Sequence, residues 1–201
     1  MARSYNGSPS VRRKCFPRGS SGREMEELVE LARLLNERNT VDSKIARIVG
    51  RSARVGDVGE YIAARIFEIK LYNSGSHKGS DGVFTGGPFK GKTVNVKFDT
   101  DSGNGLDLEP PGSTEFYLVL SGGGKVMGTK GINRPLTIDF VHIFDEPTLM
   151  GKLMARHVKI GINTSVKNED WDGAEIYPDN RSQIYNLNED QRRMLRLFEG
   201  P

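Results

Sequence analysis

The N-terminal part of the chain carries apolar residues at helical spacing. Ser21 followed by Glu24 forms a capping-box pattern, and apolar residues then recur every three or four positions to about Asn36. Thr40 is placed to cap a short second helix. A further apolar stripe runs through residues 53–70. The pattern therefore predicts three consecutive helices.

After Leu71 the pattern changes to short runs typical of strands. The clearest run, 93–98, alternates apolar and polar residues, whereas 116–120 is apolar throughout, as in a buried strand. Helices preceding a small sheet that is flanked by further helices indicate an α/β or α+β body. The other predicted elements are strands at 81–84 and 137–144 and helices at 146–156 and 188–199.

Composition narrows the class of protein. The chain has 201 residues, of which 36% are apolar, enough for one domain with a real core. It contains no apolar run long enough to span a membrane and no secretory signal pattern. One cysteine, Cys15, excludes a disulfide framework and a Cys-rich zinc site. These features predict a soluble, cytoplasmic protein that does not act in a membrane.

The charge is unevenly distributed. The net charge is +3, but residues 1–23 hold six basic side chains and no acidic one, so the rest of the chain is slightly acidic. Ser, Gly and Pro crowd the same segment, which predicts a disordered basic arm at 1–23 and a single domain at 24–201. The arm fits loose contact with nucleic-acid phosphates, a solubilising terminus, or an organellar presequence, and these stay open.

One motif suggests a nucleotide site. Residues 86–93 match the phosphate-loop pattern G-x-x-x-x-G-K-[ST], and 141–146 supply an apolar strand ending in acids. A phosphate loop requires a helix after its Lys-Thr pair, whose amides face the phosphates. Here 93–98 has the pattern of a strand, and Pro88 removes one backbone donor. The pattern favours a hairpin turn, with an NTPase as the alternative.

A second set of polar residues fits metal-dependent hydrolysis. Asn95 and Lys97 share one face of their strand, with Val96 turned into the core, and Asp81 opens the preceding strand. If the two strands pair as a hairpin, Asp81 comes near Asn95 and Lys97. Glu60 supplies a second carboxylate from the preceding helix. Carboxylate, amide and carbonyl oxygens suit Mg²⁺, and a lysine can orient or deprotonate a water or balance charge on a phosphate.

Small residues surround Glu60 on its helix. Gly56, Gly59 and Ala63 lie three or four positions away or adjacent to it. Small side chains let a helix approach a sheet closely, so we expect Glu60 to lie near the sheet rather than in open solvent.

These residues resemble the PD-(D/E)XK, or restriction-endonuclease-like, nuclease superfamily. The resemblance rests on Gly59-Glu60 in a helix, Ser80-Asp81-Gly82 opening a strand, and Asn95-Val96-Lys97 in the next strand. It spans about residues 40–180 and is closest to an uncharacterised subgroup of restriction-endonuclease-like domains. It implies an α/β/α core with a small mixed central sheet flanked by helices. Further supporting segments are 55–66, 77–83, 92–97, 117–120 and 158–161.

The resemblance also implies roles and partners. Asp81 and Glu60 would be metal carboxylates, Val96 would offer its carbonyl, and Lys97 would be the catalytic lysine beside them. The implied cofactor is Mg²⁺, for which Mn²⁺ can substitute; DNA is the implied partner, and a homodimer stays open. The implied activity is that of a metal-dependent endodeoxyribonuclease. Asn95 would also be a metal ligand.

The sequence departs from the superfamily at two places. Asn95 stands where the pattern usually has Glu or Asp, which removes a negative charge and lowers the expected metal affinity. The alternative is therefore a catalytically inactive module of the same fold that binds nucleic acid or a protein partner. The superfamily also has a helix after the lysine strand, whereas 99–113 has the composition of a loop. Asp99 shares the face of Lys97 and is a candidate to compensate.

Other chemically notable residues are weaker candidates. The three histidines, His77, His142 and His157, lack metal-ligand spacing, although His77 precedes Asp81 by four residues, within reach of a phosphate near the site. Trp171 is predicted to be a packing residue. The same holds for Tyr177 and Tyr185.

Overall fold

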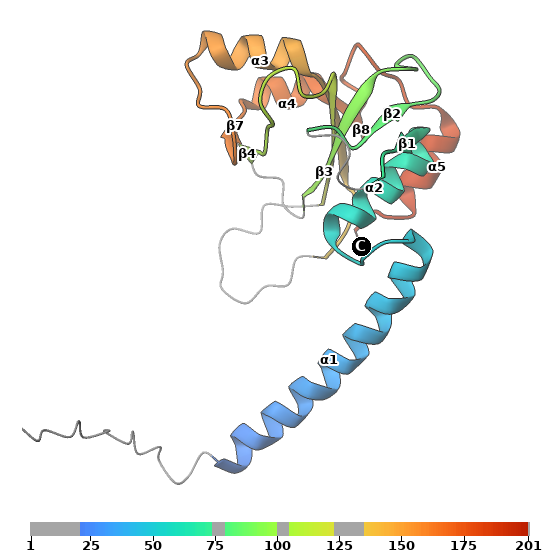
Figure 1. The fold of residues 1–201 in the computed structure, drawn as a ribbon, viewed down its shortest axis with the longest axis vertical. Coiled ribbons are helices and arrows are strands. Elements are labelled where there is room, and N and C mark those ends of the chain that lie inside the picture. The colour runs from blue at the N-terminus through green and yellow to red at the C-terminus, as the bar shows by residue number, and fades with distance from the viewer. Residues whose placement is uncertain (1–20, 74–78, 100–104, 123–134, 201) are drawn as a thin grey trace, which may run out of the picture. The chain divides into compact units, whose positions relative to one another are not determined.

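The computed structural model describes residues 21–73, 79–99, 105–122 and 135–200 (Figure 1). The chain forms two compact units, Met1–Lys44 and Ile45–Pro201. Most of the predicted basic arm lies outside the described residues, as does His77. Within the part of the chain that is described, no helix is long and apolar enough to cross a membrane.

A single helix, α1 (Ser21–Val49), forms the described part of the first unit and continues into the second. The expected break near Thr40 is wrong. The Thr40 hydroxyl donates to the carbonyl of Asn36 at 3.0 Å, and the Ser43 hydroxyl donates to that of Asn39 at 2.7 Å. A hydroxyl bonded to the carbonyl four residues earlier leaves the helical ladder intact, so Thr40 continues the helix instead of capping a new one.

The second unit is a mixed α/β body, as the order of predicted elements indicates. Its main sheet has six strands in the order β1-β2-β3-β5-β6-β8, and a separate two-stranded sheet joins β4 to β7. In chain order the elements are α2 (Val55–Ile66), β1 (Ile69–Leu71), β2 (Gly82–Phe84), β3 (Thr93–Asp99), β4 (Gly105–Leu106), β5 (Phe116–Ser121), β6 (Phe140–Asp145), α3 (Glu146–Ala155), β7 (Thr164–Ser165), α4 (Asn168–Ala174), β8 (Glu175–Tyr177) and α5 (Glu189–Arg196).

The sheet is mixed because one pair of neighbours is parallel. β3 and β5 run parallel, with Asn95 opposite Tyr117, while every other pair in the main sheet is antiparallel. Parallel neighbours need a crossover connection. Between β3 and β5 the described residues, 105–115, contain the short strand β4 and no helix, as expected from their composition.

Helices cover both faces of the main sheet (Figure 1). The sheet has two separate hydrophobic cores. On one face α2 packs against β1 and β3, and α5 packs against α2. On the other face α3 and α4 pack against β6. β5 is buried along its whole length, as its apolar run predicts. Its successive side chains point to opposite faces of the sheet, so Leu118 belongs to one core and Val119 to the other.

The third predicted helix is shorter than expected. It ends as α2 at Ile66, and the apolar residue Ile69 belongs to the strand β1 instead. Between them Glu68 has a φ of 55°, a left-handed conformation that a continuing helix does not contain. Because the chain changes direction at Glu68, the last residues of the predicted helix form an edge strand instead.

The phosphate-loop pattern folds as the hairpin turn that the sequence favours. β2 and β3 pair antiparallel, with Gly82 opposite Val94. Within the turn the Gly91 N–H donates to the Phe84 carbonyl at 2.8 Å. The Lys92 ammonium, which would bind phosphate in an NTPase, bonds the Glu115 carboxylate at 2.7 Å. No helix follows the motif, so it lacks the amides that cradle a phosphate.

Candidate active site

The β2–β3 hairpin places Asp81 against the middle of β3. The Asp81 N–H donates to the carbonyl of Val94 at 2.9 Å, which extends the ladder by one residue beyond β2. The N–H of Val96 donates to Asp81 Oδ2 at 2.7 Å. The carboxylate thus takes the place of the next backbone acceptor at the point where pairing with β2 ends. This confirms that the hairpin brings Asp81 beside β3.

Asn95 and Lys97 lie on the face of β3 opposite to Val96, as their spacing predicts. Val96 belongs to the core under α2. Asn95 is 4% exposed, and its Nδ2 donates to the carbonyl of Gly79 at 3.2 Å. Its Oδ1 is buried and has no hydrogen-bond partner among the described residues. Such an unsatisfied buried acceptor is rare, and an ordered water or a cation would satisfy it.

The carbonyl of Val96 points to the same edge of β3 as Asp81. Along a strand, the backbone groups of successive residues point to alternate sides. The Val94 carbonyl and the Val96 N–H both bond to Asp81, so both are directed toward the β2 side. The carbonyl of Val96 is therefore directed there too, beyond the last residue of β2. The backbone can thus supply the oxygen that the resemblance assigns to Val96.

Glu60 reaches the same region from α2. Gly59 makes this approach possible, because a Cβ added at Gly59 would lie 2.5 Å from the Cβ of Phe98 on β3. The expectation that small residues let α2 pack closely on the sheet is confirmed at this position. The Glu60 side chain is 20% exposed, and Arg51 Nη1 bonds its Oε2 at 2.6 Å. Glu60 is thus held near the sheet by packing and by one ion pair.

Both carboxyl groups are easier to protonate than usual. Burial raises the pKa of Glu60, the negative charge of Asp81 raises it further, and Arg51 opposes both effects. Burial also raises the pKa of Asp81, against the Val96 N–H and the charge of Lys97, which lower it. Glu60 and Asp81 are therefore close enough to repel each other, and Lys97 is close enough to attract Asp81. Asp81 therefore interacts electrostatically with both of the other two groups.

Sequence reasoning missed a third acidic residue, Glu109. Its negative charge raises the pKa of Asp81 further. The Glu109 N–H donates to the hydroxyl of the buried Tyr117 at 3.0 Å, which holds the loop against β5. The loop also touches the Asp81 segment, because a Cβ at Gly79 would lie 3.5 Å from that of Glu109. Nothing in the local pattern of a Pro- and Gly-rich loop indicates this long-range contact.

Arg51 is the second residue that the sequence did not single out. Its Nη1 bonds Glu60, and its Nη2 donates to the carbonyl of Tyr72 at 2.9 Å. The positive charge of Arg51 lowers the pKa of both Glu60 and Asp81. Arg51 therefore compensates part of the negative charge at the site. Its only sequence signal is that it is a basic residue just before α2.

The donor set fits a hard divalent cation such as Mg²⁺. Among the described residues, no group of three or more His, Cys, Asp or Glu side chains is arranged to hold a metal ion. The candidate donors here also include an amide and a backbone carbonyl. Asn95 Oδ1 is the observation that favours a ligand, since it is buried without a partner. Asp81, Asn95, Val96 and Glu60 supply only oxygen donors, the type that Mg²⁺ prefers.

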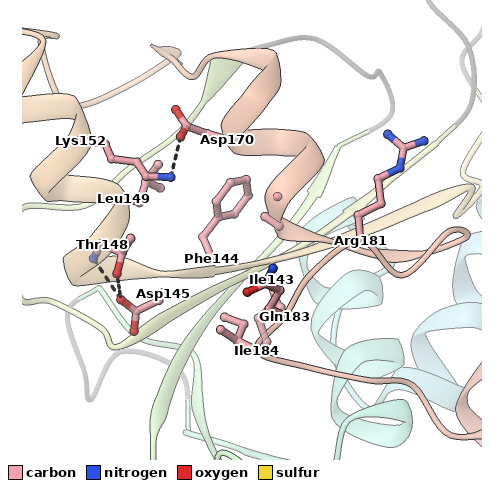
Figure 2. A pocket seen from close by; sticks show the side chains of 12 residues that line it. Ile143, Phe144, Asp145, Thr148, Leu149, Lys152, Asp170, Arg181, Gln183 and Ile184 are labelled. Atoms are coloured by element: carbon pink, nitrogen blue, oxygen red, sulfur yellow. Dashed lines mark hydrogen bonds and ion pairs between the residues drawn. The ribbon is translucent and has the colours of Figure 1, made fainter.

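A separate cavity of about 270 Å³ lies between β6, α3, α4 and the segment after β8 (Figure 2). None of the candidate site residues lines it. Its charged side chains already have partners: Lys152 Nζ bonds Asp170 Oδ1 at 2.9 Å, and Asp145 accepts from the N–H of Thr148 at 3.0 Å as the cap of α3. These polar groups stabilise the fold around the cavity and leave no unpaired charge directed into it.

Most of the weaker candidates that are described behave as packing residues, whereas His157 is exposed. His142 is 8% exposed and meets the Trp171 ring edge-on, with the ring centroids 4.8 Å apart. Tyr177 and Tyr185 are buried in the core under α2. The predictions of packing roles for Trp171 and the two tyrosines are therefore confirmed.

Comparison with known proteins assigns no family. No family model matches the chain, and no curated protein matches it either.

Proposed function

We propose that the second unit is a restriction-endonuclease-like domain that hydrolyses phosphodiester bonds of DNA with Mg²⁺. The observation that carries the proposal is the electrostatic interaction of Asp81 with both Glu60 and Lys97, together with the unpartnered Oδ1 of Asn95 on the same strand as Lys97. Two carboxyl groups with raised pKa values, a lysine and an orphaned oxygen are an arrangement typical of a functional site.

The order of elements supports the same proposal. Glu60 comes from α2, Asp81 precedes β2, and Lys97 lies on β3, which is the helix, strand and strand order on which the resemblance rests. The three are separated by up to 37 positions in the chain, yet they converge at one edge of one strand. DNA as the substrate rests on the resemblance, while phosphodiester hydrolysis rests on the residues.

Each side chain has a defined role in this hydrolysis. Asp81, Asn95, the Val96 carbonyl and Glu60 would hold Mg²⁺, which when bound polarises a phosphate oxygen and lowers the pKa of a coordinated water. Lys97 lies beside Asp81 and orients or deprotonates the attacking water, or balances the charge that develops on the phosphate. Arg51 keeps Glu60 in place and limits the repulsion between the two carboxylates.

The test combines cleavage with metal binding. We expect Mg²⁺-dependent nicking of plasmid DNA that falls by at least about 100-fold in Asp81→Asn and in Lys97→Met. Mg²⁺ should also raise the melting temperature of the wild type but not of Asp81→Asn, because a ligand that binds only the folded state stabilises it. Scanning calorimetry measures this independently of activity.

Two variants serve as matched controls. Lys92→Met removes a lysine that pairs with Glu115 outside the site, and Asp190→Asn removes an exposed carboxylate on α5. Both should retain nicking and the response to Mg²⁺. Nicking that persists in Asp81→Asn and Lys97→Met removes these residues from the mechanism. Nucleotide binding that is lost in Lys92→Met would instead support the NTPase.

Asn95 is the observation that favours the second candidate function, a catalytically inactive module of the same fold. An amide contributes no negative charge, and Glu60 is already paired with Arg51, so the site attracts a cation less strongly than a set of free carboxylates. If the domain is such a module, it binds DNA or a protein partner without cleavage under any metal. Mg²⁺ would then leave its melting temperature unchanged, which separates the two functions in the same calorimetric experiment.

A further inference from the structure

The helix of the first unit carries a broad apolar face. From Ser21 to Val41 its described side chains are exposed, and the large apolar ones are each between 47% and 63% exposed. In proteins most of the stability of a helix comes from packing of its apolar face, so a helix with such a face is normally covered by a partner. The residues concerned are Met25, Leu28, Val29, Leu31, Leu34, Leu35 and Val41.

Part of this face has the spacing of a coiled-coil seam. Met25, Leu28, Ala32 and Leu35 follow one another at intervals of three, four and three residues. Two ion pairs of the helix lie on the opposite side and share Arg33, which pairs with an acidic residue one turn before it and with another one turn after it. A third ion pair joins Arg38, which flanks the seam, to Asp42 at 3.5 Å. The helix is therefore amphipathic, with one seam open for a partner helix.

The charge along the helix selects the direction of that partner. Residues 24–30 contain four glutamates and no basic residue, whereas residues 33–44 contain three basic and two acidic residues. Two such helices side by side in parallel would place the glutamate-rich segments together, which is unfavourable. In antiparallel order each glutamate-rich segment lies beside the more basic segment of the other helix. The helix is thus complementary to itself in one orientation.

We propose that α1 pairs with α1 of a second copy of this chain as an antiparallel two-helix coiled coil. The seam then places Met25 opposite the partner's Leu35 and Leu28 opposite the partner's Ala32. In antiparallel coiled coils, equivalent flanking positions of the two helices face each other. Glu24 and Arg38 occupy equivalent flanking positions two heptads apart, so Glu24 faces the partner's Arg38, twice in the symmetric dimer.

The decisive experiment is a charge-reversal cycle on the full chain, read by sedimentation equilibrium. The wild type should be a dimer. Glu24→Arg and Arg38→Glu should each weaken dimerisation by roughly fivefold or more, because each creates two like-charge contacts. The double variant should restore it. Glu30→Arg makes the same charge change on the outer face and should have a clearly smaller effect.

A second variant tests the seam itself. Leu28→Asp places a carboxylate in each of two buried layers and should weaken dimerisation by more than about 100-fold. The fold of the second unit should be unaffected, which its thermal unfolding transition shows. A wild type that stays monomeric at all concentrations overturns the proposal, and so does a larger assembly. If Glu24→Arg and Arg38→Glu weaken dimerisation no more than Glu30→Arg does, the antiparallel order is excluded.

Discussion

Asp170 and Asp81 are both carboxylates at least partly withdrawn from solvent, but the charges that shift the pKa of Asp170 are those of two cations, whereas both cations and acids act on Asp81. The Asp170 side chain is 4% exposed and bonds Lys152 at 2.9 Å and Arg156 at 2.6 Å. Burial alone would raise the pKa of Asp170, but the two cations outweigh it and lower the pKa. Around Asp81, burial prevails over Lys97, and the pKa is raised.

This difference distinguishes a structural ion pair from a site whose acidic groups are only partly compensated by cations. At Asp170 the fold supplies two cations for one carboxylate, so the contact joins α3 to α4 and needs nothing more. At Asp81 the fold gathers Glu60 and Glu109 around the same carboxylate. This accumulation of like charge costs stability, and a bound cation would offset it.

A third buried group shows that a shifted pKa is not sufficient. Burial lowers the pKa of His142 to about 4, and its Nδ1 has no hydrogen-bond partner. Its near neighbours, however, are aromatic rings, including those of Phe144 and Trp171. Two charges act on His142, and they oppose each other: Asp172 raises its pKa and Arg181 lowers it. Convergence of several charged groups, more than the size of any one shift, distinguishes the candidate site.

The largest expected effect concerns His142. Its pKa is about 4 in the folded protein, against about 6.5 when unfolded, so the unfolded state binds more protons between these values. Stability is then full above pH about 6.5 and falls by roughly 3 kcal/mol as pH drops to about 4. His142→Phe should abolish this loss, as measured by urea unfolding from neutral to acidic pH. An unchanged pH profile contradicts the burial of a neutral imidazole.

The next largest effect on stability is expected when the contacts of Asp170 with its two cations are removed. Asp170→Asn removes the charge that two cations bind and should lower the free energy of unfolding by about 2 kcal/mol at neutral pH. Because the folded pKa is depressed, this contribution is present above the unfolded pKa of about 3.9 and is lost as pH falls below it. Asp172→Asn is the matched control, since Asp172 is 62% exposed. The control should cost less than about 0.5 kcal/mol.

The same substitution should have the opposite sign at Asp81. Asp81→Asn removes a charge that burial and Glu109 disfavour, and the Asn oxygen can still accept from the Val96 N–H. We expect a gain in stability at neutral pH that is smaller than the Asp170 loss, because Lys97 already compensates part of the cost. The folded pKa is raised, so the gain disappears below pH about 4, where Asp81 is protonated in both states. Destabilisation at neutral pH would contradict this reading.

The fold could be predicted where a local pattern determined it. The alternation at 93–98 and the apolar run at 116–120 correspond to β3 and β5, and the hairpin between β2 and β3 follows from its turn. The short strands β1, β4, β7 and β8 and the helix α4 were missed. β1 was hidden in an apparent helical stripe, and three residues are too few to show a period of two.

The candidate site was predictable to the same extent. Asp81, Asn95 and Lys97 lie on two strands joined by one hairpin, so parity and pairing place them together. Glu60 could be added because its small neighbours indicated close packing. Glu109 could not, since its position depends on a bond to Tyr117 across a Pro-rich loop. Long-range contacts of irregular segments leave no periodic trace in the sequence.

The smallest expected effect tests whether Glu109 belongs to the site. Glu109→Gln removes a negative charge near Asp81 and should lower the pKa of the Asp81 carboxyl, which the pH titration of its ¹³Cγ resonance measures. Glu60 provides an internal control, because the charges that shift its pKa are those of Asp81, Arg51 and Asp57. Its titration should move little. If the Asp81 titration stays fixed while that of Glu60 moves, the acidic loop faces α2 instead of the end of the β2–β3 hairpin. The contrast with Asp170 would then rest on the Glu60–Asp81 pair alone, because the third like charge would be absent from the site.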